Sequence, residues 1–350
     1  MSQQSPTSVP DKVCIVMMSA VGDAVHVLPV INALKRVNPR TRITWVLQPG
    51  PATLVRGHRS VDDIIIFDRS AGLGAFADVR EELAKRRFDL VINLQVYFKA
   101  GIVTALTGAP VRLGFDRARA RDMNWLFTNR KIPPHPVQHV QDQYFEFLSA
   151  LGVSPEPLEW DLGPWANERA WQREFVAQID RPIASIVVAT SKPEKDWQPE
   201  RWATVADALT HDFGMQVVLV GGRSDRELAA ERVVMDRAIT KPRSELGSGL
   251  RKLVSILDAS SVVLSPDTGP LHMTVALDRP VISLMGYTNP KRTGPYRKFH
   301  DLIVDAYGEP GEDYPISMEN RPGRMQRIEP RDVLDKVQLW SDRYRRGMRQ

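Results

Sequence analysis

The chain has 350 residues, of which 43% are hydrophobic and 25% charged, and its formal net charge is +5. This composition predicts a globular protein, and the length suits two domains better than one. The single cysteine, Cys14, excludes an internal disulfide, and no apolar run approaches the roughly 18 residues of a membrane-spanning helix.

The first ten residues are polar and rich in Ser, Gln and Pro. They lack the basic and then apolar order of a signal peptide, so residues 1–10 are predicted to be a disordered leader. Cys14 follows in the apolar run 13–16, where a buried structural thiol is expected. A lone thiol of this kind fits a reducing cytoplasm.

The first half of the chain alternates short apolar runs with helical patterns. The predicted strands are 13–17, 43–47, 64–67 and 90–94. The predicted helices are 24–37 and 76–86. Strands separated by helices indicate βαβ units and a mostly parallel sheet.

The same alternation begins again after a helical stretch, 138–151, and a segment rich in Pro and Trp, 152–165. The predicted strands of the second half are 183–189, 216–220, 261–264 and 280–284. Its predicted helices are 200–213, 271–277 and 330–350. We therefore expect two α/β domains, 1–160 and 161–350. The last helix carries four arginines near its end, which predict either a solvated basic helix end or a patch that contacts a membrane.

Two doubly wound halves predict ligands at the carboxyl ends of their strands. In the first half, Gly22 and Asp23 stand between the first strand and the first helix. Gly22 allows a sharp turn and close approach to a ligand. Asp23 is either a helix N-cap or a general base for an acceptor hydroxyl, and His26 is either a packed helix residue or an acid or base.

The second half has three segments of the same kind. Residues 265–272 follow a strand and open a helix, so the Thr268 and Gly269 amides form a natural phosphate site. Asp267 and His272 are candidates for orienting phosphate or sugar hydroxyls. The loop 190–197 offers a lysine for a diphosphate leaving group. The third segment, 286–296, is rich in Gly, Pro and Thr and predicts a long structured loop with a function.

Several motifs are absent. The sequence has no P-loop, no paired cysteines, no His-Glu-x-x-His helix and no Asp-x-Asp motif of the kind that holds a cation on a diphosphate. Phosphate binding here is therefore expected to use amides and basic side chains, without a metal or cofactor. No basic and aromatic module for nucleic acid is present.

In this order, the segments resemble glycosyltransferase family 9, the heptosyltransferases of lipopolysaccharide core assembly. The likeness runs from Lys12 to about Tyr296. It rests on residues 19–29 with Gly22-Asp23, on Leu94-Gln95 with Lys99, on 112–115, on 267–272, and on 288–296. Tyr97-Phe98 departs from the small segment that usually precedes the lysine, and no acidic residue directly follows Gly221-Gly222.

The resemblance implies a GT-B fold, which is two facing Rossmann-like domains with mostly parallel sheets. It implies that Asp23 is the catalytic base. The implied donor-binding residues are Thr190, Lys195, Gly221, Asp267, Thr268, Gly269 and His272. The implied acceptor-binding residues are Gly22, His26, Arg56, Arg59, Lys99, Arg112 and Arg117, in the first domain.

The predicted reaction is metal-independent, inverting transfer of a heptose from ADP-heptose to a hydroxyl of the lipopolysaccharide inner core, either Kdo-lipid A or a heptosylated core. The alternatives are a family-9 transferase with another sugar nucleotide or acceptor, a sugar-nucleotide epimerase, and a non-catalytic protein that binds an anionic glycolipid. The expected location is the cytoplasm, with peripheral contact with the inner membrane as an option. No nucleic-acid partner is expected.

Overall fold

The computed structural model describes residues 9–345. Most of the predicted leader, residues 1–8, lies outside the described residues, as do Arg346 and Arg349 of the basic C-terminal end. Residues 9 and 10 contradict the leader prediction. Val9 is buried, and the side chains of Asn38 and Thr41 donate hydrogen bonds to the Val9 and Pro10 carbonyls. These two residues therefore belong to the packed part of the chain.

The chain divides into two compact units. The first contains residues 9–136 and Val140–Asp161, and the second contains Val137–His139 and residues 162–345. Val137–His139 interrupt the first unit in sequence but belong to the second. His139 Nε2 lies 3.0 Å from the Gly294 carbonyl oxygen, and the His139 ring centroid lies 4.9 Å from that of Tyr296.

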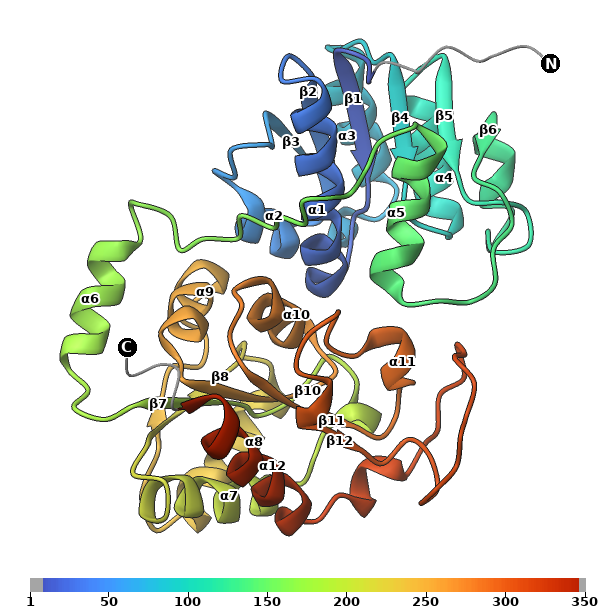
Figure 1. Ribbon diagram of the computed structural model, residues 1–350. Helices are drawn as coiled ribbons and strands as arrows, with labels where there is room; N and C mark the ends of the chain where they lie inside the picture. The colour runs from blue at the N-terminus through green and yellow to red at the C-terminus, as the bar shows by residue number, and fades with distance from the viewer. Residues whose placement is uncertain (1–8, 346–350) are drawn as a thin grey trace. The chain divides into compact units, whose positions relative to one another are not determined.

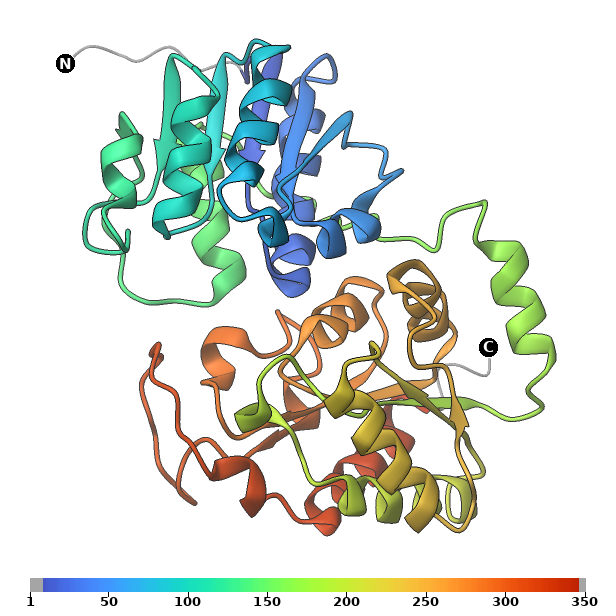
Figure 2. The same cartoon turned by 180° about the vertical axis from the view of Figure 1, so that it is seen from behind.

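In its described residues, the first unit has a six-stranded sheet in the order β3-β2-β1-β4-β5-β6, with every neighbouring pair parallel. Its strands are β1 (Lys12–Val16), β2 (Arg42–Leu47), β3 (Asp63–Ile66), β4 (Leu90–Asn93), β5 (Val111–Gly114) and β6 (Arg130–Lys131). Its helices are α1 (Val21–Val37), α2 (Pro49–Val55), α3 (Gly74–Ala84), α4 (Phe98–Leu106) and α5 (Val140–Ala150), with short 3-10 turns at Arg69–Ala71 and Asn124–Phe127. α1 and α5 cover one face of the sheet, and α3 and α4 cover the other (Figures 1 and 2).

The second unit repeats this topology. Its six-stranded sheet has the order β12-β11-β10-β7-β8-β9, again parallel between all neighbours. Its strands are β7 (Ile183–Val187), β8 (Gln216–Val220), β9 (Arg243–Ser244), β10 (Val262–Pro266), β11 (Val281–Met285) and β12 (Ile303–Asp305). Its helices are α6 (Arg169–Ala177), α7 (Pro199–His211), α8 (Asp225–Arg237), α9 (Leu250–Ala259), α10 (Gly269–Ala276), α11 (Pro290–Thr293) and α12 (Pro330–Arg343), with 3-10 turns at Pro193–Lys195, His300–Leu302 and Arg324–Arg327. α7, α8 and α12 lie on one face of the sheet, opposite α9 and α10 (Figure 2).

The central strands are buried on both faces, which explains why they read as continuous apolar runs rather than as an alternating pattern. β7, β10 and β11 are buried along their whole length. Cys14 in β1 is fully buried, and burial raises the pKa of its thiol far above the ordinary value, as expected for a structural thiol. Both sheets have the strand order of a Rossmann fold, so the predicted α/β fold of the GT-B type is confirmed.

Every strand and helix predicted from the sequence is present, with shifted ends. α12 ends at Arg343, so the helix predicted to continue to residue 350 is shorter. The sequence patterns missed several elements: α2, α4, α6, α8, α9, α11, β5, β6, β9 and β12. No described helix is long and apolar enough to cross a membrane.

Candidate functional site

In an open parallel sheet, ligands bind at the carboxyl edge, between two neighbouring strands whose following helices lie on opposite faces of the sheet. In the first unit this point lies between β1 and β4, and in the second it lies between β7 and β10. The segments that directly follow these strands contain Asp23, Gln95, Lys195 and Asp267. Each unit therefore has a cluster of candidate residues at the carboxyl edge of its sheet.

Asp23 lies in the first turn of α1, three residues after its N-cap residue, Ala20. The N-cap interpretation of Asp23 is therefore wrong, and so is the sharp turn predicted at Gly22, because the helix already begins at Val21. The Ala20 amide donates to Asp23 Oδ2 at 2.9 Å, and the Tyr144 hydroxyl donates to Oδ1 at 3.0 Å. The carboxylate is half-buried. Two donors thus orient an acid group that stays open to solvent.

Tyr144 is brought to Asp23 by α5, which packs against α1. Gln141 ties the two helices together: its Oε1 lies 2.8 Å from His26 Nδ1, and its Nε2 donates to the His26 carbonyl at 2.8 Å. His26 is buried. The structure therefore places His26 in the contact between α1 and α5. No sequence signal links Tyr144 to a residue 121 positions earlier.

Gln95 shapes the loop before Asp23. It follows β4, and its side chain spans to the loop that follows β1. The Met18 amide donates to Gln95 Oε1 at 3.1 Å, and Gln95 Nε2 donates to the Ser19 carbonyl at 2.9 Å. Ser19 directly precedes Ala20, the N-cap residue of α1. The Gln95 bridge therefore fixes the start of the helix and, with it, the position of Asp23.

The candidate acceptor-binding residues lie on several different elements. Lys99 and Arg117 are exposed and follow the carboxyl ends of β4 and β5. Arg112 lies inside β5, where it donates to the Phe127 and Ala109 carbonyls at 3.0 Å each. Arg56 is exposed at the end of α2. The Arg112 guanidinium is therefore already hydrogen-bonded to backbone carbonyls of its own unit, which the sequence alone could not reveal.

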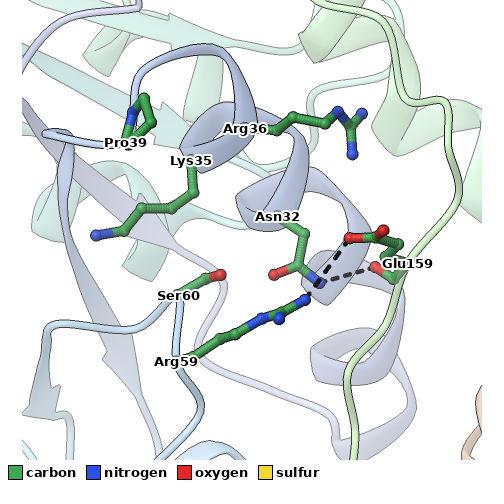
Figure 3. A pocket seen from close by; sticks show the side chains of 7 residues that line it. All are labelled: Asn32, Lys35, Arg36, Pro39, Arg59, Ser60 and Glu159. Carbon is green, nitrogen blue, oxygen red and sulfur yellow. Dashed lines mark hydrogen bonds and ion pairs between the residues drawn. The ribbon is translucent and has the colours of Figure 1, made fainter.

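Arg59 lines a pocket with Asn32, Lys35 and Glu159 (Figure 3). Asn32 and Lys35 follow Asp23 on α1 by nine and twelve residues, which corresponds to roughly 14–18 Å along the helix axis. Arg59 is paired with Asp161 at 2.7 Å, and Asn32 donates to the Glu159 carbonyl. Arg59 thus lies near the far end of α1 from Asp23, and its ion pair with Asp161 stabilises the segment around residue 160.

In the second unit, the Asp267 carboxylate is the centre of a dense network. Lys195 Nζ lies 2.6 Å from its Oδ2, and the Thr288 and Thr293 hydroxyls donate to the same oxygen at 2.5 and 3.3 Å. His272 Nε2 lies 3.6 Å from Oδ1. The predicted residues Lys195, Asp267 and His272 therefore come together, and they are joined by two threonines from the loop 286–296.

Burial alone would raise the pKa of Asp267, whose side chain is 7% exposed. The imidazole of His272, 3.6 Å away, and the positive charge of Lys195 outweigh burial and hold the pKa of Asp267 well below its usual range. Asp267 is consequently an ionised partner that fixes Lys195 beside the start of α10. The amides at a helix N-terminus lack partners within the helix, so the Thr268 and Gly269 amides are available to an anion next to this lysine.

The turn before Lys195 is held by its neighbour Asp196. The Thr190 amide donates to Asp196 Oδ1 at 2.6 Å, and Arg226 Nη2 lies 2.9 Å from Oδ2. Burial raises the pKa of Asp196, against the lowering effect of these partners. Trp197 then anchors the turn in the core, since it is buried and donates to the Ile328 carbonyl at 2.9 Å. Thr190 is buried, and its amide therefore stabilises the turn that carries Lys195 through the hydrogen bond to Asp196.

Gly221 directly follows β8 and leads into the cap of α8. The acid at this place is Glu227, whose carboxylate accepts from the Gly222 amide at 2.6 Å and from the Ser224 amide at 2.9 Å. A Cβ atom on Gly222 would lie 2.8 Å from Glu227 Oε2, so a side chain at this position would displace the carboxylate. Asp225 is exposed at the helix start, whereas the Glu227 side chain folds back onto the loop.

Known proteins resemble this chain in both sequence and fold. The model of glycosyltransferase family 9 (heptosyltransferase) matches residues 76–314. The chain is 30% identical over 304 residues to the lipopolysaccharide core heptosyltransferase OpsX of Haemophilus influenzae, covering 87% of this chain and 86% of the relative. It is 28% identical over 301 residues to lipopolysaccharide heptosyltransferase 1 of Escherichia coli K12, covering 82% and 91% of the two chains.

Solved structures give the same result. The E. coli heptosyltransferase WaaC with ADP matches with a TM-score of 0.72 and 25% identity, over 95% of this chain and 99% of that one. A family 9 glycosyltransferase from Veillonella parvula has the same fold, with a TM-score of 0.78 at 21% identity over 94% and 96% of the two chains.

The fold and the two carboxyl-edge clusters thus define a nucleotide-sugar-dependent glycosyltransferase. The chain belongs to glycosyltransferase family 9, the heptosyltransferase family. It is accordingly an enzyme of the glycosyltransferase class, which sets aside the epimerase and the non-catalytic glycolipid-binding alternatives.

Proposed function

We propose that this enzyme transfers a heptose from ADP-heptose to a hydroxyl of the lipopolysaccharide inner core, with inversion at the anomeric carbon and without a metal ion. The relatives named above are lipopolysaccharide heptosyltransferases, and WaaC has been solved with ADP and with ADP-2-deoxy-2-fluoro heptose. The observation that carries the proposal is the Asp23 carboxylate, which two hydrogen bonds orient while it remains open to solvent.

In the proposed step, Asp23 removes the proton from the acceptor hydroxyl. The acceptor oxygen then bonds to the anomeric carbon, the bond from that carbon to the diphosphate oxygen breaks, and ADP leaves with the electron pair. Attack from the face opposite the diphosphate inverts the anomeric centre. A base positioned in this way contributes about 100-fold to 10,000-fold in rate.

The second unit is proposed to bind the donor. Lys195 has three N–H donors, and its pairing with Asp267 leaves donors available to the diphosphate. The Thr268 and Gly269 amides lie at the adjacent helix start. Charge on the departing ADP grows as the bond breaks, so these preorganised groups act most strongly in the transition state. The first unit is proposed to bind the acceptor, with Lys99 and Arg117 as the predicted cations at its carboxyl edge.

The direct test measures ADP release from ADP-heptose with and without Kdo-lipid A, for the parent and for Asp23→Ala. We expect acceptor-dependent release in the parent and its loss in the variant. Asp180→Ala is the matched control, because the Asp180 side chain is 91% exposed and should leave release unchanged.

Release that does not depend on the acceptor would contradict the proposed acceptor, and unchanged release in Asp23→Ala would contradict the proposed base. A family-9 transferase with another sugar nucleotide or glycan acceptor is the second candidate. A panel of donors and acceptors, scored by the same release of nucleotide diphosphate, distinguishes it. A cytoplasmic location with peripheral contact with the inner membrane stays a prediction.

A further inference from the structure

Two loops at the carboxyl edge of the first sheet are fixed side by side. One joins β4 to α4 through Tyr97, and the other follows β5 and contains residues 121–127. The Arg121 amide donates to the Val96 carbonyl at 2.8 Å, and Asn124 Nδ2 donates to the Tyr97 carbonyl at 2.7 Å. Asn124 is buried and is also bonded to Asn93 at the end of β4. The two loops therefore form one supported surface.

Large apolar side chains project from this surface into solvent. Tyr97 is 51% exposed, Phe98 39%, Met123 57% and Leu126 57%. Met123 has a φ of 57°, a left-handed conformation that is uncommon for such a residue. Exposed apolar side chains gathered in this way mark a contact surface rather than ordinary protein exterior.

The surface rests on a close-packed base. The ring of Phe98 lies edge-on to that of Phe127, with 5.3 Å between centroids. A Cβ atom on Gly101 would lie 2.2 Å from the Phe127 ring, so glycine is needed at this point of α4. The apolar side chains are thus presented by a fixed scaffold.

Cations surround the apolar group. Lys99, Arg117 and Arg121 are exposed, and no ion pair involves any of the three within residues 9–345. The Arg117 guanidinium lies over the ring of Trp125, 4.5 Å from its centroid. Asp122 is the exposed acid between them. The basic–apolar surface, defined as Tyr97, Phe98, Lys99, Arg117, Arg121, Met123 and Leu126, therefore has an excess of positive charge.

We propose that the basic–apolar surface binds anionic phospholipid membranes. Apolar and aromatic side chains enter the boundary between headgroups and acyl chains, while lysines and arginines around them pair with lipid phosphates. A protein partner fits less well, since the centres of protein interfaces are depleted of charged residues. The basic end of α12 is a weaker candidate, because Arg343 is already paired with Asp301 at 2.9 Å.

Membrane binding here would bring a lipid-linked acceptor to the edge of the sheet that carries Asp23, since the two loops follow β4 and β5 and Asp23 follows β1. This last step rests on the proposed function, whereas membrane binding itself does not.

The test is co-sedimentation of the full chain with vesicles, in the absence of donor and acceptor. One vesicle contains phosphatidylethanolamine and phosphatidylglycerol, and the other contains phosphatidylcholine alone. We expect binding to the anionic vesicle that weakens as salt rises, and little binding to the neutral one. The double substitution Met123→Ser/Leu126→Ser should weaken binding at least about tenfold. Arg121→Gln should weaken it by about fivefold.

The matched control is Ile239→Ser/Met318→Ser, which removes exposed apolar side chains that are 79% and 48% accessible in the other unit. It should bind like the parent, and thermal unfolding should confirm that all variants are folded. Absence of binding by the parent, or equal binding by the Met123/Leu126 variant and the parent, would overturn the proposal.

A second assay, transfer to a soluble, deacylated acceptor, distinguishes membrane binding from a role of this surface in binding the acceptor itself. The Met123/Leu126 variant should match the parent in this assay. A loss of turnover there, together with vesicle binding equal to that of the parent, would assign the surface to an acceptor-binding pocket and overturn membrane binding. If the parent is inactive with every acceptor yet binds anionic vesicles as expected, the proposed function fails while the membrane proposal stands.

Discussion

The two units present an aspartate at the carboxyl edge of the same kind of sheet, but in contrasting surroundings. Asp23 is half-buried and accepts two hydrogen bonds from neutral donors, and no cation is paired with it within the described part of the chain. Asp267 is nearly inaccessible and is surrounded by Lys195, His272 and two threonine hydroxyls. One carboxylate is oriented and open, and the other is enclosed and paired with a lysine.

This contrast shows how environment divides the work between identical side chains. A general base must reach its substrate and accept a proton, so a buried carboxylate that is paired with a lysine and two hydroxyls is unsuited to that role. A carboxylate that holds a lysine in place must stay ionised, which the lowered pKa of Asp267 ensures. Asp23 therefore suits chemistry on the acceptor, and Asp267 suits support of the donor site.

The largest expected effect is on stability at Asp267. Asp267→Ala removes the partner of a half-buried lysine and of two threonine hydroxyls, which should lower the free energy of unfolding by about 3–5 kcal/mol. Urea unfolding followed by tryptophan fluorescence measures this. Asp23→Ala should cost far less in the same experiment, and equal losses would remove the distinction between the two aspartates.

The pH dependence sharpens the same point. Because the folded-state pKa of Asp267 is lowered, its ionised form contributes stability above the ordinary carboxyl value of about 3.9 and loses that contribution as pH falls below it. The stability advantage of the parent over Asp267→Asn should therefore be constant near neutral pH and shrink below about pH 4. An advantage that grows on acidification would contradict the ion pair.

The next largest effect is on turnover at Asp23. Asp23→Asn keeps the shape of the side chain and can still accept a hydrogen bond, but it cannot take a proton. Turnover should fall by about 100-fold or more, while the dissociation constant for donor changes little. Steady-state ADP release and calorimetric titration of ADP measure the two quantities. A loss of donor affinity with turnover intact would move Asp23 from base to binding residue.

A smaller effect is expected at Lys195. Lys195→Gln removes a charged donor from the proposed diphosphate site, which should weaken ADP binding by about 10-fold to 100-fold. Lys192→Gln is the control, since Lys192 is an exposed lysine of the same turn. Calorimetric titration should show the loss only in the first variant, and similar losses in both would indicate a general electrostatic effect.

The smallest effect is expected at Tyr144. Tyr144→Phe removes one of the two hydrogen bonds that orient Asp23, which should lower turnover by roughly twofold to tenfold without changing ADP binding. Tyr307→Phe provides a control, because Tyr307 is a buried tyrosine whose hydroxyl bonds to Ser317 and to the Glu319 carbonyl. If both variants lose turnover equally, the effect of Tyr144 is not specific to Asp23.

The sequence predicted the local parts of this enzyme well. Buried parallel strands produce continuous apolar runs, so the central strands and the division into two α/β halves were readable. The order of short motifs was sufficient to indicate the family. Edge strands such as β6 and β9 have two residues each and no apolar pattern, and α8 and α9 lie in segments for which the sequence patterns gave no prediction.

The candidate residues divide in the same way. Residues close in sequence, such as Asp267, Thr268 and Gly269, were assigned from the strand–turn–helix pattern alone. Partners supplied from a distance were missed: Tyr144 for Asp23, Thr288 and Thr293 for Asp267, and Glu227 for the glycines after β8. Arg59 and Arg112 were grouped with the acceptor site because charge is visible in a sequence, whereas the partners that already occupy these side chains are not.

By itself, then, the sequence determined the fold type, the enzyme family and which loops follow the central strands. These properties depend on the period of apolar residues and on short motifs, which are local. Only the tertiary structure decided that Asp23 is oriented and open while Asp267 is paired and enclosed. The state of a carboxylate depends on burial and on donors within a few ångströms, and folding brings those donors from positions up to 121 residues away.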